Sequence, residues 1–231
     1  MEKGSFVMFG HQHLYAIFTA IFFTIILSAV VKKYASSKTE AVVRITLALV
    51  IWIQESSVWI YRICNNMFIV HENLPLHLCG FSALLLPILL FTKNKKLYDV
   101  LYFWGIGGAT QALLTPTLEF SFPHFLFIQF FTAHGLIVTA VIYATVVFNY
   151  QPDFRALLRT FLITISLLIP IGFINWILGS NYFFIARKPD SASLLDFMGP
   201  WPFYLIPLAL VAFIIFFIIY IPFPIINRLR R

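Results

Sequence analysis

The sequence predicts an all-α integral membrane protein, a bundle of seven transmembrane helices with the N-terminus outside and the C-terminus in the cytoplasm. Apolar residues make up 61% of the chain and charged residues only 11%, which lies far outside the range of water-soluble domains. Stretches of about 20 apolar residues, each long enough to cross about 30 Å of hydrocarbon, recur along the chain. The seven predicted spans are 12–31, 42–63, 75–92, 97–116, 125–148, 157–178 and 202–222.

The first span is predicted to be retained and not removed as a signal peptide. It is too long for that role, and Lys32 and Lys33 stop it without a small-residue cleavage site. The third span begins near Pro75, a residue that suits the first position of a helix. The sequence shows no repeat that pairs its two halves, no low-complexity tract and no long linker. Residues 1–231 are therefore predicted to form one integral domain.

Lysine and arginine residues gather in alternate loops, which sets the predicted orientation. The loops after the first, third, fifth and seventh spans carry Lys32, Lys33, Lys38, Arg44, Lys93, Lys95, Lys96, Arg155, Arg159, Arg228, Arg230 and Arg231. The opposite side carries only Lys3, Arg62, Arg187 and Lys188. We expect a bacterial cytoplasmic membrane protein whose net charge of +7 reflects this topology and anionic lipid headgroups, without a nucleic-acid partner.

Polar residues inside the spans concentrate toward the outer side, where each needs a partner or a water-filled cavity. In chain order they are Gln54 and Glu55 in the second span, His77 and Cys79 in the third, Thr110, Gln111 and Thr115 in the fourth, His134 in the fifth, and Asn175, Ser180 and Asn181 around the end of the sixth. The inner halves are nearly pure hydrocarbon. This asymmetry predicts an outward-facing polar cavity, roofed by segments 115–124 and 181–204, although Trp201 and Tyr204 fit an interfacial aromatic belt equally well.

Cys79 is the first candidate nucleophile because a thiol near a helix start meets the positive end of the backbone dipole. His77 is about 200° away around the helix and points to a different face. His134 is the other histidine within the core of a span, so it is the candidate base. The predicted helix ends place it about 8 Å deeper than Cys79 at 1.5 Å per residue, a mismatch that tilt or stagger can absorb.

Each candidate also has a structural interpretation. Cys79 can be a small buried apolar residue or form a disulfide with Cys64 in an oxidising compartment. His134 can bond across helices, and Glu55 can orient His134, bind a substrate amine or carry protons. A metal site is also conceivable at three histidines outside the span cores, but their spacing matches no closed zinc pattern, so no metal or cofactor is predicted. These are His11, His13 and His124.

Several ordered motifs resemble the bacterial YwaF proteins, which are similar to human transmembrane protein 164. They are Leu74-Pro75-Leu76-His77-Leu78-Cys79, the run from Gly107 to Pro116, His134-Gly135, Asn175-Trp176 through Gly179-Ser180-Asn181-Tyr182, and Gly199-Pro200-Trp201-Pro202. The human relative is regarded as a cysteine-dependent lipid acyltransferase. The resemblance implies that Cys79 takes the place of the nucleophile and His134 that of the base.

The expected function is an intramembrane lipid acyltransferase or transacylase with an acyl-lipid or lysolipid substrate drawn from the membrane. Cys79 and His134 would be catalytic, and the oxyanion would be stabilised by Gln111, Asn175 or backbone N–H groups near Pro75. The remaining predicted cavity residues are Glu55, His77, Thr115, Asn181, Trp201 and Tyr204. The alternative is a transporter or receptor that binds a small polar solute in the same cavity. A chaperone or scaffold without chemistry is a third reading.

Overall fold

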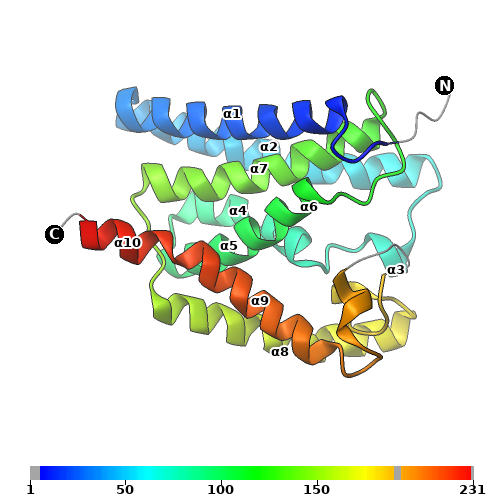
Figure 1. The fold of residues 1–231 in the computed structure, drawn as a ribbon. Helices are drawn as coiled ribbons and strands as arrows, with labels where there is room; N and C mark the ends of the chain where they lie inside the picture. The colour runs from blue at the N-terminus through cyan, green and yellow to red at the C-terminus, as the bar shows by residue number, and fades with distance from the viewer. Residues whose placement is uncertain (1–5, 190–193, 230–231) are drawn as a thin grey trace.

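The computed structural model describes residues 6–189 and 194–229, and every element in that part of the chain is helical. The α-helices are α1 (His11–Tyr34), α2 (Ser37–Cys64), α3 (Val70–Asn73), α4 (Leu78–Thr92), α5 (Lys95–Trp104), α6 (Thr110–Leu114), α7 (Phe125–Val147), α8 (Phe154–Leu178), α9 (Leu205–Tyr220) and α10 (Pro222–Leu229). A π-helical turn, η1 (Gly105–Ala109), joins α5 to α6, and the 3₁₀ turns are η2 (Tyr182–Phe184) and η3 (Leu194–Met198). In Figure 1, α1, α2 and α7 lie along one side of the bundle, α8 and α9 along the other, and α4 and α5 between them.

Five helices are long and apolar enough to cross a membrane, so the protein is a multi-pass membrane protein. They are α1, α2, α7, α8 and the continuous run Leu205–Leu229. The predicted spans 75–92 and 97–116 correspond to shorter pieces. α4 has 15 residues, and α5, η1 and α6 follow one another without a break as a rod that we call the α5–α6 rod.

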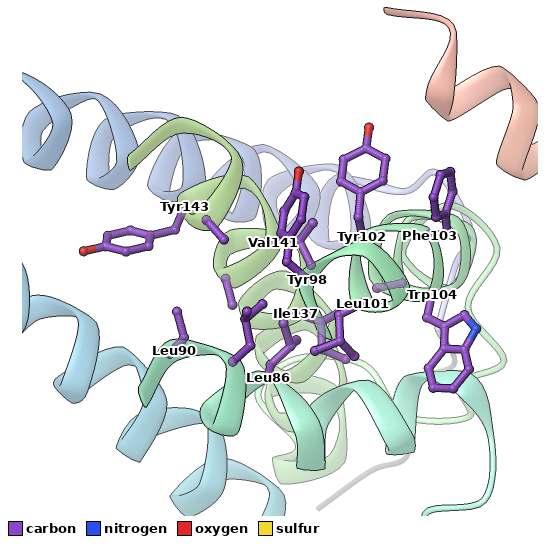
Figure 2. Close-up of a cluster of buried hydrophobic side chains, with 14 of the residues drawn as sticks. Leu86, Leu90, Tyr98, Leu101, Tyr102, Phe103, Trp104, Ile137, Val141 and Tyr143 are labelled. Atoms are coloured by element: carbon purple, nitrogen blue, oxygen red, sulfur yellow. The ribbon is translucent and has the colours of Figure 1, made fainter. Parts of the chain in front are cut away.

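α7 is the most buried of the five long helices, and the core forms where it meets α4 and α5. Figure 2 shows Leu86 and Leu90 of α4, Leu101 of α5, and Ile137 and Val141 of α7 turned toward one another. All five side chains are buried. Lipid tails are as apolar as these side chains, so moving the side chains from lipid into the core gains little. Tight packing therefore holds the helices together, while each helix satisfies its own backbone hydrogen bonds.

Small and hydroxyl-bearing residues allow α1 to approach α7 closely. A Cβ placed on Gly135 would lie 3.1 Å from the Cβ of Ala20. One turn further along, the hydroxyl groups of Thr24 and Thr139 lie 2.7 Å apart and share a hydrogen bond. This is the small-residue packing typical of membrane helices.

An ion cluster fastens α5 to α8 at the end of the bundle where α1 ends and α2 begins. Asp99 is buried and pairs with Lys95 one turn before it and with Arg159 Nη2 of α8 at 2.7 Å. The basic residues of the alternate loops thus have a structural use in addition to any interaction with lipids. We refer to this end as the charged end, and to the opposite end, where α3, η2 and η3 lie (Figure 1), as the cap end.

Candidate functional site

Cys79 is the second residue of α4, in the first turn of a helix that begins at the cap end. The sequence suggests Pro75 as the first residue of this helix. The helix instead starts at Leu78, and Pro75 lies before it. The reason is visible at Gly80, where a Cβ would lie 2.7 Å from the backbone of Pro75. The chain therefore folds back over the first turn of α4, and only glycine leaves room for it.

The first turn of α4 carries backbone donors without acceptors. The N–H groups of Leu78, Cys79 and Gly80 precede the first intrahelical bond, which Phe81 N makes to His77 O at 3.0 Å. Within residues 6–189 and 194–229, no side chain caps them, and His77 at the N-cap position makes no capping bond. The thiol of Cys79 thus lies beside unpaired N–H groups at the positive end of a helix dipole.

The sulfur of Cys79 rests against the π-helical turn of the α5–α6 rod. A Cβ on Gly108 would lie 3.2 Å from Cys79 Sγ. The same substitution at neighbouring Gly107 would meet only ordinary contacts of 3.5 Å, with Ile215 and Phe216. π-Helical turns occur frequently at functional sites, and here the turn presents a bare glycine to the thiol.

His134 lies on the stripe of α7 that faces this rod. A Cβ on Gly105 would lie 2.7 Å from Val141 Cγ2 and 3.2 Å from Ile137 Cγ2. The rod and α7 run in opposite directions (Figure 1), so one turn toward the cap end leads from Gly105 to Gly108 and from Ile137 to His134. His134 therefore lies on the stripe of α7 that continues from Ile137 toward the cap end, as Gly108 continues the rod from Gly105 toward the same end.

The hydrogen bond of His134 defines which ring nitrogen is free. Nδ1 lies 2.8 Å from Phe130 O, and a carbonyl oxygen only accepts, so Nδ1 carries the proton in the neutral ring. The lone pair is then on Nε2, which is the nitrogen a base needs. In the described part of the chain no hydrogen bond joins His134 to Cys79. Both Cys64 and Cys79 are free thiols, so they do not form the disulfide that was the alternative for Cys79.

Glu55 of α2 is a carboxylate within a membrane span. It interacts electrostatically with Arg62 of the same helix. It also lies within electrostatic range of Cys79. A carboxylate at this position in a membrane span is costly, which favours a functional role.

Gln111 and Thr115, two predicted cavity residues, follow Gly108 along the rod and are exposed. The hydroxyl of Thr115 donates to the backbone O of Gln111 at 3.1 Å, so it closes the end of α6. The structure does not bring the Gln111 side chain into a hydrogen bond within residues 6–189 and 194–229. Both residues therefore lie on the surface of the rod.

Asn175 joins the end of α8 to the segment that leads into α4. Its Oδ1 accepts from Ser180 Oγ at 2.7 Å and from Tyr182 N at 2.8 Å, and its Nδ2 donates to Tyr182 O at 2.9 Å. The hydroxyl of Tyr182 then donates to Val70 O at 2.6 Å and accepts from Leu74 N at 3.0 Å. Burial raises the pKa of Tyr182, which keeps its hydroxyl a donor at neutral pH. Asn175 thus serves to position the chain before Cys79.

His77 belongs to the same connection. Its Nδ1 accepts from Phe183 N at 3.3 Å, and its ring lies 5.4 Å from those of Tyr182 and Phe184, centre to centre. The imidazole therefore faces η2. His77 is the N-cap residue and has extended backbone, so it faces different neighbours from Cys79 because of the chain before α4 and not because of helical spacing.

The other predicted outer residues build a cap on this network. Asn181 Oδ1 accepts from the backbone N–H groups of Ala186 and Arg187, at 3.2 and 3.1 Å. Trp201 Nε1 donates to Ile185 O at 3.1 Å, and the Tyr204 hydroxyl donates to Phe184 O. Trp201 is exposed, whereas Tyr204 is fully buried, so Tyr204 is a cap residue and not part of a lipid-facing belt.

Ser82 is a candidate that the sequence alone did not single out. It is fully buried one turn along α4 from Cys79, and its hydroxyl has no hydrogen-bond partner. Buried hydroxyl groups are almost always bonded, so such an exception calls for a ligand or a role. The signal in the sequence was the spacing of three residues from Cys79, which places both side chains on one face.

Neither of two cavities in the described part of the chain is lined by Cys79 or His134. One, about 600 Å³ in volume and largely apolar, lies between α1 and α7 and includes Ala20, Gly135 and Thr139. The other lies at the charged end. Two of the histidines considered for a metal make other hydrogen bonds: His13 Nδ1 accepts from Phe9 N and its Nε2 bonds Leu113 O, and His124 Nδ1 accepts from Leu126 N.

The fold defines a multi-pass helical membrane protein with the Cys79 thiol and the His134 imidazole on two helices, α4 and α7, that pack together. The chain belongs to the TMEM164 family, whose model matches residues 8–220, in agreement with the resemblance of the sequence motifs. It is similar to an uncharacterized protein of Treponema pallidum (strain Nichols), with 25% identity over 152 residues. That alignment covers 66% of this chain and 63%, less than two thirds, of the Treponema protein. No solved structure matches the chain.

Proposed function

We propose that the protein is a lipid acyltransferase or transacylase that uses Cys79 as nucleophile and His134 as base. The observation that carries the proposal is the approach of Cys79 Sγ, in the first turn of α4, to Gly108 of the rod that also packs against α7. Both α4 and α7 begin at the cap end, so both side chains lean toward that end. The proposed topology has seven spans, α4 and the α5–α6 rod included, with the N-terminus outside and substrate entering from the outer leaflet of a bacterial membrane.

The reaction would proceed in two steps that share one proton carrier. His134 Nε2 removes the proton of the Cys79 thiol as Sγ attacks the ester carbonyl of a lipid. The C–O bond then breaks, the leaving lysolipid alkoxide takes the proton from His134, and the acyl group stays on Sγ as a thioester. In the second step a lysolipid hydroxyl or water gives its proton to His134 and attacks the thioester; the C–S bond breaks, and the leaving Cys79 thiolate takes the proton back from His134.

The unpaired N–H groups of Cys79 and Gly80 are the proposed oxyanion donors. They can donate hydrogen bonds to an oxyanion that develops beside Sγ without any rearrangement of the backbone. Catalysis of acyl transfer requires donors that are preorganised in this way. Asn175 is already bonded to Tyr182 and Ser180, so backbone groups near Pro75 are the better choice. Glu55 would hold a cationic headgroup of the lipid, because its carboxylate is within electrostatic range of Cys79.

An electrophilic acyl-lipid probe on the purified, detergent-solubilised protein tests this proposal. Intact mass should locate one adduct on Cys79, and Cys79→Ala should abolish it. Cys64→Ala is the matched control, since Cys64 is the more exposed free thiol and its loss should leave the adduct unchanged. Replacement of His134 by Ala should slow labelling by on the order of 100-fold. Labelling that is indifferent to both Cys79 and His134 would contradict the proposal.

A polar-solute transporter or receptor is the alternative, and Glu55 is the residue that favours it. Intramembrane carboxylates commonly mark a solute path. The other two residues of that hypothesis do not converge on Glu55, because His77 faces η2 and Gln111 is exposed. Solute binding that is lost with Glu55→Gln and retained in Cys79→Ala would establish this alternative over the enzyme.

A further inference from the structure

A polar cavity of about 480 Å³ lies at the charged end, remote from the thiol. The end of α1, the start of α2, the loop after α4 and the end of α7 surround it, and these segments meet at one end of the bundle in Figure 1. Cys79 and Lys93 lie at opposite ends of α4, roughly 20 Å apart at 1.5 Å per residue. The cavity is therefore separate from the proposed catalytic site.

Two lysines from different segments form its cationic wall, and each is held in place. Lys32 Nζ donates to Asn149 Oδ1 at 2.8 Å. Lys93 Nζ lies 3.0 Å from Glu40 Oε2 and 4.9 Å from the centre of the Phe148 ring. The Asn149 side chain is a neutral amide, so this hydrogen bond does not balance the charge of Lys32.

Glu40 is the carboxylate in the cavity lining, and its charge is already compensated. Its Oε1 lies 3.1 Å from Arg44 Nε and accepts from the Tyr143 hydroxyl at 3.2 Å, while Oε2 faces Lys93. With Arg44 opposite Glu40, the two lysines leave a net positive charge around the cavity. An anion would thus be attracted to it.

The N-terminus of α2 opens into the same cavity through Ser36 and Ser37. Ser36 Oγ caps Thr39 N at 3.2 Å, and Glu40 N bonds Ser36 O at 2.8 Å. In the described residues the N–H groups of Ser37 and Lys38 have no acceptor. A helix of 28 residues with free amide groups at its start is suited to bind a phosphate.

We infer that this cavity binds a phosphate-bearing anion, with Lys32, Lys93 and the first amide groups of α2 as its ligands. The apolar side chains of Val31, Val147 and Phe148 adjoin the polar groups. A phospholipid of the leaflet at the charged end would satisfy both, with its phosphate on the lysines and its tails along the helices. A free phosphorylated solute shares the phosphate chemistry but would not use the apolar wall.

Native mass spectrometry of the full-length protein in detergent tests the inference. Phosphatidylglycerol should be retained more strongly than phosphatidylcholine of the same chain length. Lys32→Gln and Lys93→Gln should each lower that retention about fivefold, since one lysine near an anionic lipid contributes about 1 kcal/mol. Lys93→Arg should restore it, which separates loss of charge from loss of fold.

Lys33→Gln is the matched control, because Lys33 is adjacent to Lys32 but lies over Tyr34, 5.0 Å from its ring centre, outside the cavity lining. Its retention of phosphatidylglycerol should be unchanged. An equal loss in all three glutamine variants would mean diffuse surface charge and would overturn the site. Competition by millimolar inorganic phosphate, sensitive to Lys32, would support the site and identify a free phosphate as its ligand. Equal retention of both lipids without such competition would overturn it.

Discussion

The two ends of the bundle treat polar groups in opposite ways. At the charged end, the buried carboxylate of Asp99 and the half-buried carboxylate of Glu40 each face two cationic groups. At the cap end, neutral hydrogen bonds around Asn175 and Tyr182 fix the chain, yet the groups beside Cys79 have no partners. Ion pairs hold helices together where water is near, whereas unpaired donors persist where a substrate can complete them.

Loss of the Asn175 side chain should produce the largest change in stability at the cap end. Asn175→Ala removes three buried hydrogen bonds, and at about 1 kcal/mol each the free energy of unfolding should fall by about 3 kcal/mol. Thermal unfolding in detergent measures this. Asn181→Ala is the comparison, because its bonds are exposed and their loss should matter less. Equal destabilisation would show that the Asn175 network does not anchor the cap.

Two neighbouring glycines of η1, Gly107 and Gly108, distinguish an effect on the position of the Cys79 sulfur from an effect on the stability of the helix. Gly108→Ala places a methyl group 3.2 Å from Cys79 Sγ, so the sulfur must shift. A misplacement of this kind should reduce acyl transfer to a lipid acceptor by roughly 10- to 100-fold. Gly107→Ala makes the same change in helix propensity but meets only ordinary contacts, and its rate should be nearly unchanged. Equal rates for both variants would remove Gly108 from the site.

The contrast between the ends also explains what the sequence could predict. Hydrophobic length predicts a multi-pass helical protein directly, because the bilayer sets that length. The π-helical turn at Gly105–Ala109 could not be read from an apolar run, since a single extra residue per turn leaves the composition unchanged. That turn contains Gly108, whose missing side chain leaves room for Cys79 Sγ, and hydrophobic periodicity does not predict this contact.

Polar residues at the cap end illustrate a second limit. Their concentration near the ends of the spans was visible in the sequence, but the partner of each was not. Asn175 and Asn181 look alike in composition, and only the fold shows that one fastens η2 to α8 while the other closes a turn. Hydrogen-bond pairing between distant segments depends on loop geometry, which periodicity does not encode.

The smallest expected effect is at two buried serines, one on α4 and one on α1. Ser82 and Ser28 are both buried, and neither hydroxyl has a partner. Removal of an unsatisfied buried hydroxyl should leave stability unchanged or raise it by up to about 1 kcal/mol, so both serine-to-alanine variants should fold. Because Ser82 shares a helix face with Cys79, Ser82→Ala should raise KM for the acyl lipid by roughly fivefold. Ser28→Ala should not change KM, since Ser28 lies on α1. An unchanged KM in both variants would mean that the Ser82 hydroxyl is an unpaired packing residue and that the substrate does not reach the second turn of α4.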